Sequence, residues 1–150
     1  MRNLDTYYMN IAIETSKLSY CIAHKVGAVI VKDNNIISIG YNGTPSGHIN
    51  CCDAFAKGMF TRTEHHNWSN QFEGHAESSA IAQAAKTGKN INTSTLYCTL
   101  RPCWNCLKLI IQSGIVRVVY NEEYNKHDYS TDMINMLKTI NIKIEKLCDQ

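Results

Sequence analysis

The chain has 150 residues, 44% of them apolar, and a formal net charge of +2. This length fits one domain with its own hydrophobic core, the apolar content excludes a disordered chain, and the small charge gives no support for nucleic-acid binding. The sequence has no run of about 18 apolar residues, and residues 1–8 lack the basic start and apolar stretch of a signal peptide, so we expect a cytoplasmic protein with a single domain over residues 1–150.

The N-terminal part of the sequence predicts a helix followed by a β-hairpin. Apolar residues recur at helical spacing over residues 4–19. Two β-branched runs, at residues 26–31 and 36–41, predict strands. The turn residues Asp33-Asn34-Asn35 between these runs predict that the two strands form a hairpin.

Two segments without regular periodicity follow the hairpin. Residues 40–47 contain glycine and proline too often for a helix or a strand, which predicts a loop. Residues 48–72 are polar and weakly periodic, which also predicts a loop. A loop of this length inside a compact domain is usually functional or is held in place by another group.

In the second half of the chain, helices and strands alternate, and this order is typical of an α/β domain built in layers. The expected order is helix 76–86, strand 95–100, helix 103–113, strand 115–120, helix 132–139 and strand 142–147. Cys98 lies within the first of these strands, and we expect it to be an ordinary core residue.

The seven cysteines point to metal rather than to disulfides, because their number is odd and no export signal precedes them. Cys103 and Cys106 stand three residues apart at the start of a predicted helix, so both sulfurs lie on one face. The positive end of the helix dipole favours their thiolate forms. Together with His75 they make a three-ligand set that leaves one position of a tetrahedral zinc site open, as in catalytic sites.

The sequence after His75 supplies the acid–base group that such a site needs. Glu77 follows two residues later and can move a proton from an activated water to a ring nitrogen and then to a leaving amine. The pattern His-x-Glu with Pro-Cys-x-x-Cys is the signature of zinc-dependent deaminases. A redox pair or half of a structural zinc site would explain Cys103 and Cys106, but neither would give Glu77 a role.

These motifs carry a resemblance to a known family. They resemble the cytidine and deoxycytidylate deaminase superfamily. The loop Gly-Tyr-Asn-Gly-Thr-Pro at residues 40–45, after Val-Gly-Ala at residues 26–28, resembles its deoxycytidylate (dCMP) deaminases, and the middle segment resembles their phage branch. The resemblance covers residues 11–124. It implies a three-layer α/β/α sandwich around a five-stranded mixed sheet, and zinc-dependent hydrolysis of dCMP to dUMP and ammonia, which supplies dUMP for thymidylate synthesis.

The resemblance also implies roles for residues around the substrate. Asn42 would hydrogen-bond the nucleotide near its sugar, Tyr124 would contact the substrate, and Lys86 would meet its phosphate. The backbone at Ala76 and Thr99 would read the pyrimidine edge. The side chains have ordinary structural alternatives: a turn asparagine, a packing tyrosine and a solvated surface lysine.

Some members of the phage branch carry a second, structural zinc, and the resemblance implies matching ligands in this chain. The matching residues are Cys21, Cys51, His65 and Glu73. A metal held by them would pin the polar segment 48–72 to the N-terminal helix. Cys52 and His66 are adjacent alternatives for two of the ligands. Without a metal, these cysteines would be small buried residues.

Regulation and assembly are implied by the resemblance alone. Members of the family are typically homo-oligomers, often hexamers, activated by dCTP and inhibited by dTTP, with Mg2+ accompanying the triphosphate. The glycine-rich loop with Gly43, together with Lys17 and Ser19 near the end of the first helix, is the candidate triphosphate site, because glycine-rich backbone approaches phosphate closely. A plain loop after a hairpin is the alternative.

Two other functions compete with dCMP deamination. The same signature serves enzymes that act on cytidine, guanine, riboflavin precursors or bases in tRNA and DNA, but the modest charge and the Gly-Tyr-Asn-Gly loop argue against a nucleic-acid substrate. A structural or interaction module that binds zinc without turnover would leave Glu77 without a role. We expect no nucleic acid and no membrane as partner, and a phage-encoded protein would act in the cytoplasm of its host cell.

Overall fold

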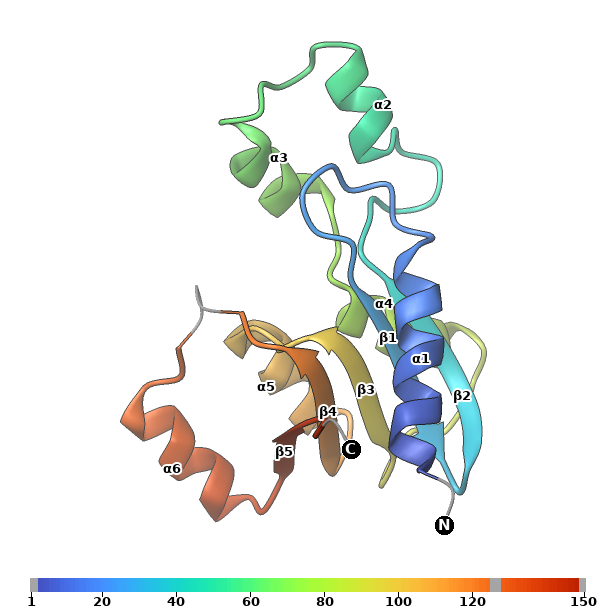
Figure 1. The fold of residues 1–150 in the computed structure, drawn as a ribbon, viewed down its shortest axis with the longest axis vertical. Helices are drawn as coiled ribbons and strands as arrows, with labels where there is room; N and C mark the ends of the chain where they lie inside the picture. The colour runs from blue at the N-terminus through green and yellow to red at the C-terminus, as the bar shows by residue number, and fades with distance from the viewer. Residues whose placement is uncertain (1–2, 125–127, 149–150) are drawn as a thin grey trace.

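The computed structural model describes residues 3–124 and 128–148 (Figure 1). One five-stranded sheet forms the centre of the molecule, with the strand order β2-β1-β3-β4-β5. The elements follow one another as α1 (Leu4–Ser16), β1 (Gly27–Lys32), β2 (Asn35–Tyr41), α2 (Cys51–Ala56), α3 (His65–Phe72), α4 (Ala76–Lys86), β3 (Thr95–Leu100), α5 (Trp104–Gln112), β4 (Arg117–Glu122), α6 (Thr131–Thr139) and β5 (Lys143–Lys146). No helix in the two described ranges is long and apolar enough to cross a bilayer.

The sheet is mixed because its two halves are connected in different ways. β1 pairs antiparallel with β2 on one side and with β3 on the other. β3, β4 and β5 run parallel and are joined by the crossover helices α5 and α6. The hairpin turn lies where the sequence predicts it: Asp33 and Asn34 have φ angles of 50° and 60°, the left-handed conformation that a two-residue hairpin turn requires.

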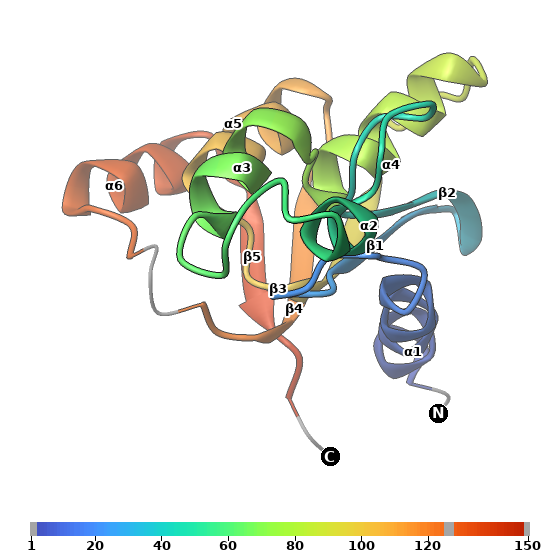
Figure 2. The same cartoon turned by 90° about the horizontal axis from the view of Figure 1, so that it is seen from above.

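Helices cover both faces of the sheet and complete the three-layer α/β/α sandwich that the sequence predicts (Figure 2). Strand β1 divides its side chains between two cores. Ala28 and Ile30 pack on the face covered by α4 and α5, whereas Val29 and Val31 pack on the face covered by α1. A strand buried on both faces needs apolar residues at successive positions, which is why this run shows no alternation of apolar and polar residues.

Helix α4 lies directly against the sheet because small residues line its contact with β2. Gly40 leaves no room for a side chain: a Cβ there would lie 2.3 Å from the backbone nitrogen of Ala80 and 2.4 Å from the backbone oxygen of Ala76. The hydroxyl of Ser38 donates to the backbone oxygen of Ala80 at 2.7 Å. This contact fixes the first turn of α4, which carries Glu77, against the hairpin.

We expect Gly40→Ala to lower the free energy of unfolding by about 2 kcal/mol or more, because the added methyl group pushes α4 away from β2. Gly43→Ala is the matched control, since a Cβ at Gly43 meets no atom within 4 Å. Urea unfolding of both variants measures the difference. Equal stabilities for the two variants would contradict the close packing of α4 on β2.

Residues 48–72 are not the long loop that the sequence predicts. They contain α2 and α3, which project above the sheet as a small lobe (Figure 1). The buried residues of its separate core are Cys21, Cys51, Ala54, Phe60 and Trp68. Asn50 caps α2 by accepting from the backbone N–H of Asp53 at 3.0 Å. Helices of 6 and 8 residues are too short for their periodicity to stand out in a polar segment.

An ionic network joins the first helix to the far side of the sheet. Arg117 of β4 donates two hydrogen bonds to Asp5 of α1, at 2.8 and 2.7 Å, and also contacts Glu145 of β5. The Tyr97 hydroxyl donates to Asp5 at 2.7 Å. The hydrogen bonds from Arg117 hold the pKa of the Asp5 carboxyl group below its usual value.

We expect this network to make the free energy of unfolding depend on pH in the acidic range. The pKa of Asp5 is lower in the folded chain than in the unfolded chain, so its stabilising effect is complete above about pH 4 and is lost as the pH falls further. Asp5→Asn should therefore lower the free energy of unfolding by about 2 kcal/mol at pH 7, and by much less near pH 2. Urea unfolding across this pH range is the measurement, and a difference that does not change with pH would contradict the assignment.

Candidate metal and active site

The N-termini of α4 and α5 bring three metal-binding side chains together. His75 directly precedes α4, Cys103 directly precedes α5, and Cys106 lies in the first turn of α5. The Nδ1 atom of His75 lies 3.2 Å from the Cys106 sulfur and 3.6 Å from the Cys103 sulfur. Nitrogen and sulfur ligands of a tetrahedral zinc stand about 3.5 Å apart, so these atoms have the spacing of a zinc site.

The composition of this cluster is that of a catalytic site. Within the described ranges, it has three donor atoms that all lie within 4.8 Å of one another. One imidazole and two thiols are donors that zinc prefers, and three protein donors leave one tetrahedral position for water or substrate. A zinc ion therefore fits the residues present and would keep a reactive position open.

Local hydrogen bonds favour a thiolate in this cluster. The pKa of the Cys103 thiol is lowered, first because the Cys106 side chain donates to its sulfur, and also because His75 does so. The backbone N–H of Cys106 adds a contact of 3.4 Å to the same sulfur. The contact between the two thiols, with burial, raises the pKa of Cys106, so the pair shares one proton. A metal ion competes with that proton for the sulfurs.

Glu77 lies in the first turn of α4 and is buried, with 4% of its surface exposed. Burial raises the pKa of its carboxyl group, although the nearby His75 opposes this shift. A carboxyl group with a raised pKa can both accept and return a proton near neutral pH, which is what general acid–base catalysis requires. The predicted acid–base residue therefore has suitable surroundings.

Cys98 is closer to this site than the sequence predicts. It is fully buried in β3, as expected of a core residue, but its thiol also lies close enough to the Glu77 carboxyl group for the two groups to shift each other's pKa. Burial raises the pKa of Cys98 well above its usual value, so the thiol keeps its proton. Side chains alternate between the two faces along a strand, and this alternation places residue 98 on the face that α4 covers. It is the sequence signal that could have revealed this contact.

A group of side chains lies beside Cys103 and Cys106 that no sequence motif identifies. The Arg101 guanidinium lies 4.0 Å from the centre of the Tyr129 ring, and that ring centre lies 5.7 Å from the ring centre of Trp104. The Tyr129 hydroxyl donates to the backbone oxygen of Pro102 at 2.5 Å. No spacing rule connects position 129 with the motif at 102–106, so only the fold reveals that Tyr129 packs beside Arg101 and Trp104.

A second group of four donors lies at the base of the α2–α3 lobe. The ligand atoms of Cys21, Cys51, His65 and Glu73 all lie within 4.8 Å of one another. The Cys21 sulfur lies 3.5 Å from His65 Nε2, again the spacing of sulfur and nitrogen on a tetrahedral zinc, which is about 3.5 Å. Four protein donors fill a tetrahedral site, which is the composition of a structural metal site.

The carboxylate of Glu73 has the surroundings of a metal ligand. Its side chain is 2% exposed, and neither oxygen has a hydrogen-bond partner among the described residues. The Nε2 atom of His65 lies 3.8 Å from one oxygen, and burial lowers the pKa of His65, which keeps that ring neutral at pH 7. A buried carboxylate without a hydrogen bond or a counter-charge is strongly destabilising, and a bound divalent cation would relieve this.

The adjacent alternatives for two of these ligands, Cys52 and His66, point elsewhere. The Cys52 sulfur hydrogen-bonds Asn50 at 3.2 Å. The His66 ring is exposed and contacts the Asn70 amide at 3.1 Å. The geometry therefore favours Cys51 and His65 over their neighbours.

Two of the predicted substrate-binding residues are fixed by the backbone around them. The Asn42 side chain accepts from the Val26 N–H at 2.8 Å and donates to the His24 carbonyl at 2.7 Å. The Thr99 hydroxyl accepts from the Gly27 N–H at 3.1 Å. Both residues therefore have fixed positions at the end of the sheet where β2 and β3 end and β1 begins.

The other three predicted substrate-binding residues have different surroundings. Ala76 is fully buried at the start of α4, so its backbone is the part that a ligand could reach. Tyr124 packs edge-on against His24, with ring centres 5.7 Å apart. Lys86 is exposed in the last turn of α4, about 14 Å along the helix axis from Glu77.

The three predicted effector residues differ in their exposure to solvent. Ser19 is 1% exposed, and its hydroxyl donates to the Asn42 carbonyl at 2.9 Å and accepts from the Cys21 N–H at 3.2 Å. The Ser19 hydroxyl thus connects two loops and has two protein partners. Lys17 is exposed and pairs with an acidic side chain of its own helix. Gly43 is partly exposed in the loop after β2.

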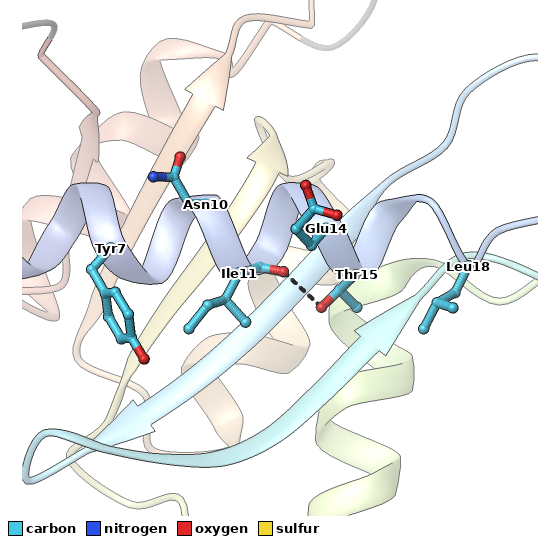
Figure 3. Close-up of a pocket in the computed structure, with 6 residues that line it drawn as sticks. All are labelled: Tyr7, Asn10, Ile11, Glu14, Thr15 and Leu18. Carbon is cyan, nitrogen blue, oxygen red and sulfur yellow. Dashed lines mark hydrogen bonds between the residues drawn. The ribbon is translucent and has the colours of Figure 1, made fainter.

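A separate hollow of about 390 Å³ runs along α1 (Figure 3). It is lined by Tyr7, Asn10, Ile11, Glu14, Thr15 and Leu18. Because α1 and α4 cover opposite faces of the sheet, this hollow is remote from the catalytic cluster (Figure 2). It contains none of the residues that the sequence predicts for a site.

Comparison with known proteins agrees with this geometry. Residues 2–122 match the family model of the cytidine and deoxycytidylate deaminase zinc-binding region. The deoxycytidylate deaminase of Enterobacteria phage T4 is 38% identical over 157 aligned positions. The match covers 84% of this chain and 81% of that protein. The deoxycytidylate deaminase of Mycobacterium phage D29 is 36% identical over 123 residues, which cover 79% of this chain and 94% of that protein.

Solved structures give the same result. The dCMP deaminase from the cyanophage S-TIM5, in complex with dCMP and dUMP, superimposes with a TM-score of 0.79 at 37% identity and covers 98% of this chain and 99% of that chain. The motifs from His75 to Cys106 lie inside the range that the family model matches. The chain is similar to phage dCMP deaminases and belongs to the cytidine and deoxycytidylate deaminase family.

Proposed function

We propose that this protein hydrolyses dCMP to dUMP and ammonia. The observation that carries the proposal is the three-donor cluster of His75, Cys103 and Cys106 with the buried Glu77 close by. The choice of nucleotide comes from the relatives, because the cyanophage enzyme is in complex with dCMP and dUMP and the T4 and D29 proteins are deoxycytidylate deaminases. The dUMP formed would serve thymidylate synthesis.

The cluster would hold one zinc ion through His75 Nδ1 and the two sulfurs, and zinc bound in this way makes hydroxide available at neutral pH. Glu77 carries out the proton transfers. Its raised pKa suits it to accept a proton from water and pass it to N3 of the cytosine ring as hydroxide adds to C4. It would then take the proton of the new C4 hydroxyl group and deliver it to the amino group, which leaves as ammonia while C4 becomes a carbonyl. The buried Cys98 thiol would help to orient that carboxyl group from its position nearby.

The nucleotide would lie at the sheet edge where β2 and β3 end. Asn42 would contact the sugar, and the backbone at Ala76 and Thr99 would hydrogen-bond the pyrimidine edge. Tyr124 would pack against the nucleotide from the loop after β4. Lys86 would reach the phosphate when the nucleotide lies extended along α4, since about 14 Å of helix separates it from the catalytic end.

The second cluster would hold a structural zinc. The buried Glu73 carboxylate without a hydrogen-bond partner among the described residues supports this assignment. The ion would tie three parts of the chain together, because Cys21 follows α1, Cys51 and His65 begin the two helices of the lobe, and Glu73 precedes α4. Binding of a metal to such a site contributes directly to folding stability.

Assembly and regulation are proposed from family membership. The protein would form a homo-oligomer, a hexamer in the expected case, activated by dCTP and inhibited by dTTP, each bound with Mg2+. Lys17 and Gly43 are accessible to a triphosphate, whereas Ser19 is buried. A dCMP saturation curve that stays hyperbolic and does not respond to dCTP would remove the effector part of the proposal.

Steady-state rates on dCMP, deoxycytidine, cytidine and single-stranded DNA test the proposed activity. We expect kcat/KM to be highest for dCMP, with ammonia and dUMP formed in equal amounts. A higher kcat/KM on a nucleoside or on DNA would reassign the substrate. If the zinc-loaded protein released no ammonia from any of the four, a zinc-binding module without turnover would replace the proposal.

A further inference from the structure

A single three-residue segment belongs to both metal clusters. Glu73 is a donor of the second cluster, His75 is a donor of the catalytic cluster, and Gly74 alone separates them. The backbone is extended at both donors, with φ and ψ of −100° and 131° at Glu73 and −78° and 157° at His75. Side chains two positions apart in an extended chain point to the same side. The two clusters therefore adjoin one short piece of backbone, with only Gly74 between a donor of one and a donor of the other.

Gly74 ties this segment to the loop that carries Asn42. The Gly43 N–H donates to the Gly74 carbonyl at 3.1 Å, and the Gly74 N–H donates to the Gly43 carbonyl at 2.8 Å. Gly43 directly follows Asn42, so any shift of the segment moves the residue proposed to meet the sugar. The segment between the clusters is thus connected to the substrate side of the molecule.

A second path connects the same loop to the second cluster. Ser19 is buried between them: its hydroxyl donates to the Asn42 carbonyl and accepts from the N–H of Cys21, a donor of that cluster. The path from Cys21 through Ser19, Asn42 and Gly43 to Gly74 returns to Glu73. A metal bound by Cys21 and Glu73 would close this path into a ring.

We propose that the second cluster is the positioning device of the catalytic site: its metal holds Glu73, which sets His75 through Gly74, and holds Cys21, which sets Asn42 through Ser19. The proposal rests on the proposed function for the role of Asn42 in binding dCMP. It assigns Glu73, Gly74 and Ser19 as positioning residues, since they act through their neighbours and are not placed against the reacting atoms. Beyond stabilising the fold, the second metal then sets both catalytic-metal retention and nucleotide binding.

Cys51→Ala in the zinc-loaded enzyme is the first test, with Cys52→Ala as the matched control. Cys51 is a donor that belongs to neither path, and the sulfur of Cys52 hydrogen-bonds Asn50 outside the cluster. We expect Cys51→Ala to lose one zinc per chain. The zinc that remains should be released to a chelator about tenfold faster than in Cys52→Ala, the usual size of an effect on ligand orientation, and the KM for dCMP should rise by a similar factor.

The outcomes distinguish the presence of the second metal from its role in positioning the catalytic site. If Cys51→Ala loses one zinc and the release rate and KM match those of Cys52→Ala, the second metal is present and the positioning role is wrong. If the zinc-loaded wild type holds only one zinc per chain, the second metal site itself is wrong. If the wild type does not deaminate dCMP, the proposed function fails, while the zinc-release rate still decides whether the clusters are coupled.

Gly74→Pro tests the connection without changing any donor. It removes the N–H that donates to Gly43, and the extended backbone of Glu73 is the conformation that a following proline requires. Gly74→Ala keeps the N–H, and its Cβ would meet Ser79 Oγ at an ordinary 3.6 Å. We expect Gly74→Pro to keep both zinc ions and to release the catalytic one about tenfold faster than Gly74→Ala does. Equal release rates in the two variants would overturn the proposal.

Discussion

Glu77→Gln is expected to lower kcat for dCMP roughly 10³-fold while the zinc content stays at the wild-type level. The amide has nearly the shape of the carboxyl group, so packing in the buried site is kept, but it cannot accept a proton from water or return one to the leaving amine. Because Glu77 is not a donor of the cluster, metal binding should not depend on it. Ammonia release from dCMP and elemental analysis of the same sample measure both quantities.

Glu14→Gln is the matched control for this variant. Glu14 is an exposed carboxylate on α1, which covers the opposite face of the sheet, and we expect its removal to leave kcat unchanged. Full activity of Glu77→Gln would show that another group transfers the protons. Loss of zinc from Glu77→Gln would instead show that the carboxylate is a ligand, and that the cluster has no open position.

Cys103→Ala is expected to have the other large effect, a loss of the catalytic zinc and of roughly 10³-fold or more in kcat/KM. With one sulfur removed, His75 and Cys106 make only a two-donor site, which binds zinc too weakly to retain it at low free metal. The second cluster shares no donor with the first, so its zinc should remain. We expect the zinc content to fall from the two ions per chain proposed above to one, together with the loss of turnover.

Cys148→Ala separates this effect from the general loss of a thiol. Cys148 is exposed beyond β5, and its sulfur lies 3.9 Å from the backbone oxygen of Lys146. We expect this variant to keep the zinc content and the activity of the wild type. An active Cys103→Ala variant, or one that still holds as much zinc as Cys148→Ala, would mean that the metal is bound elsewhere.

The catalytic cluster is the part of the molecule that sequence spacing predicts best. His75 and Cys103 each stand directly before a helix and Cys106 lies one turn later, so the geometry of a helix N-terminus brings them together once α4 and α5 are neighbours. The helix at 76–86 and the strand at 95–100 also have the predicted bounds. The central sheet and its two helical layers confirm the predicted fold class.

Other features depend on tertiary contacts that no local pattern contains. The first helix ends at Ser16 rather than near Ser19, because Ser19 is taken up by its hydrogen bonds to Asn42 and Cys21. The lobe of α2 and α3 has few apolar residues in any regular repeat, and it packs around a small core beside four groups that could hold a metal ion. Tyr129 approaches the cysteines from a distant part of the chain. Such contacts require the fold before they can be seen.

Anomalous diffraction at the zinc edge, from crystals of the zinc-loaded protein, tests the central claim most directly. We predict a peak bonded to His75 Nδ1 and to the sulfurs of Cys103 and Cys106, with a solvent molecule in the fourth position and Glu77 beside that molecule. A peak whose fourth ligand is a protein side chain, or the absence of any peak among these three residues, would contradict the account.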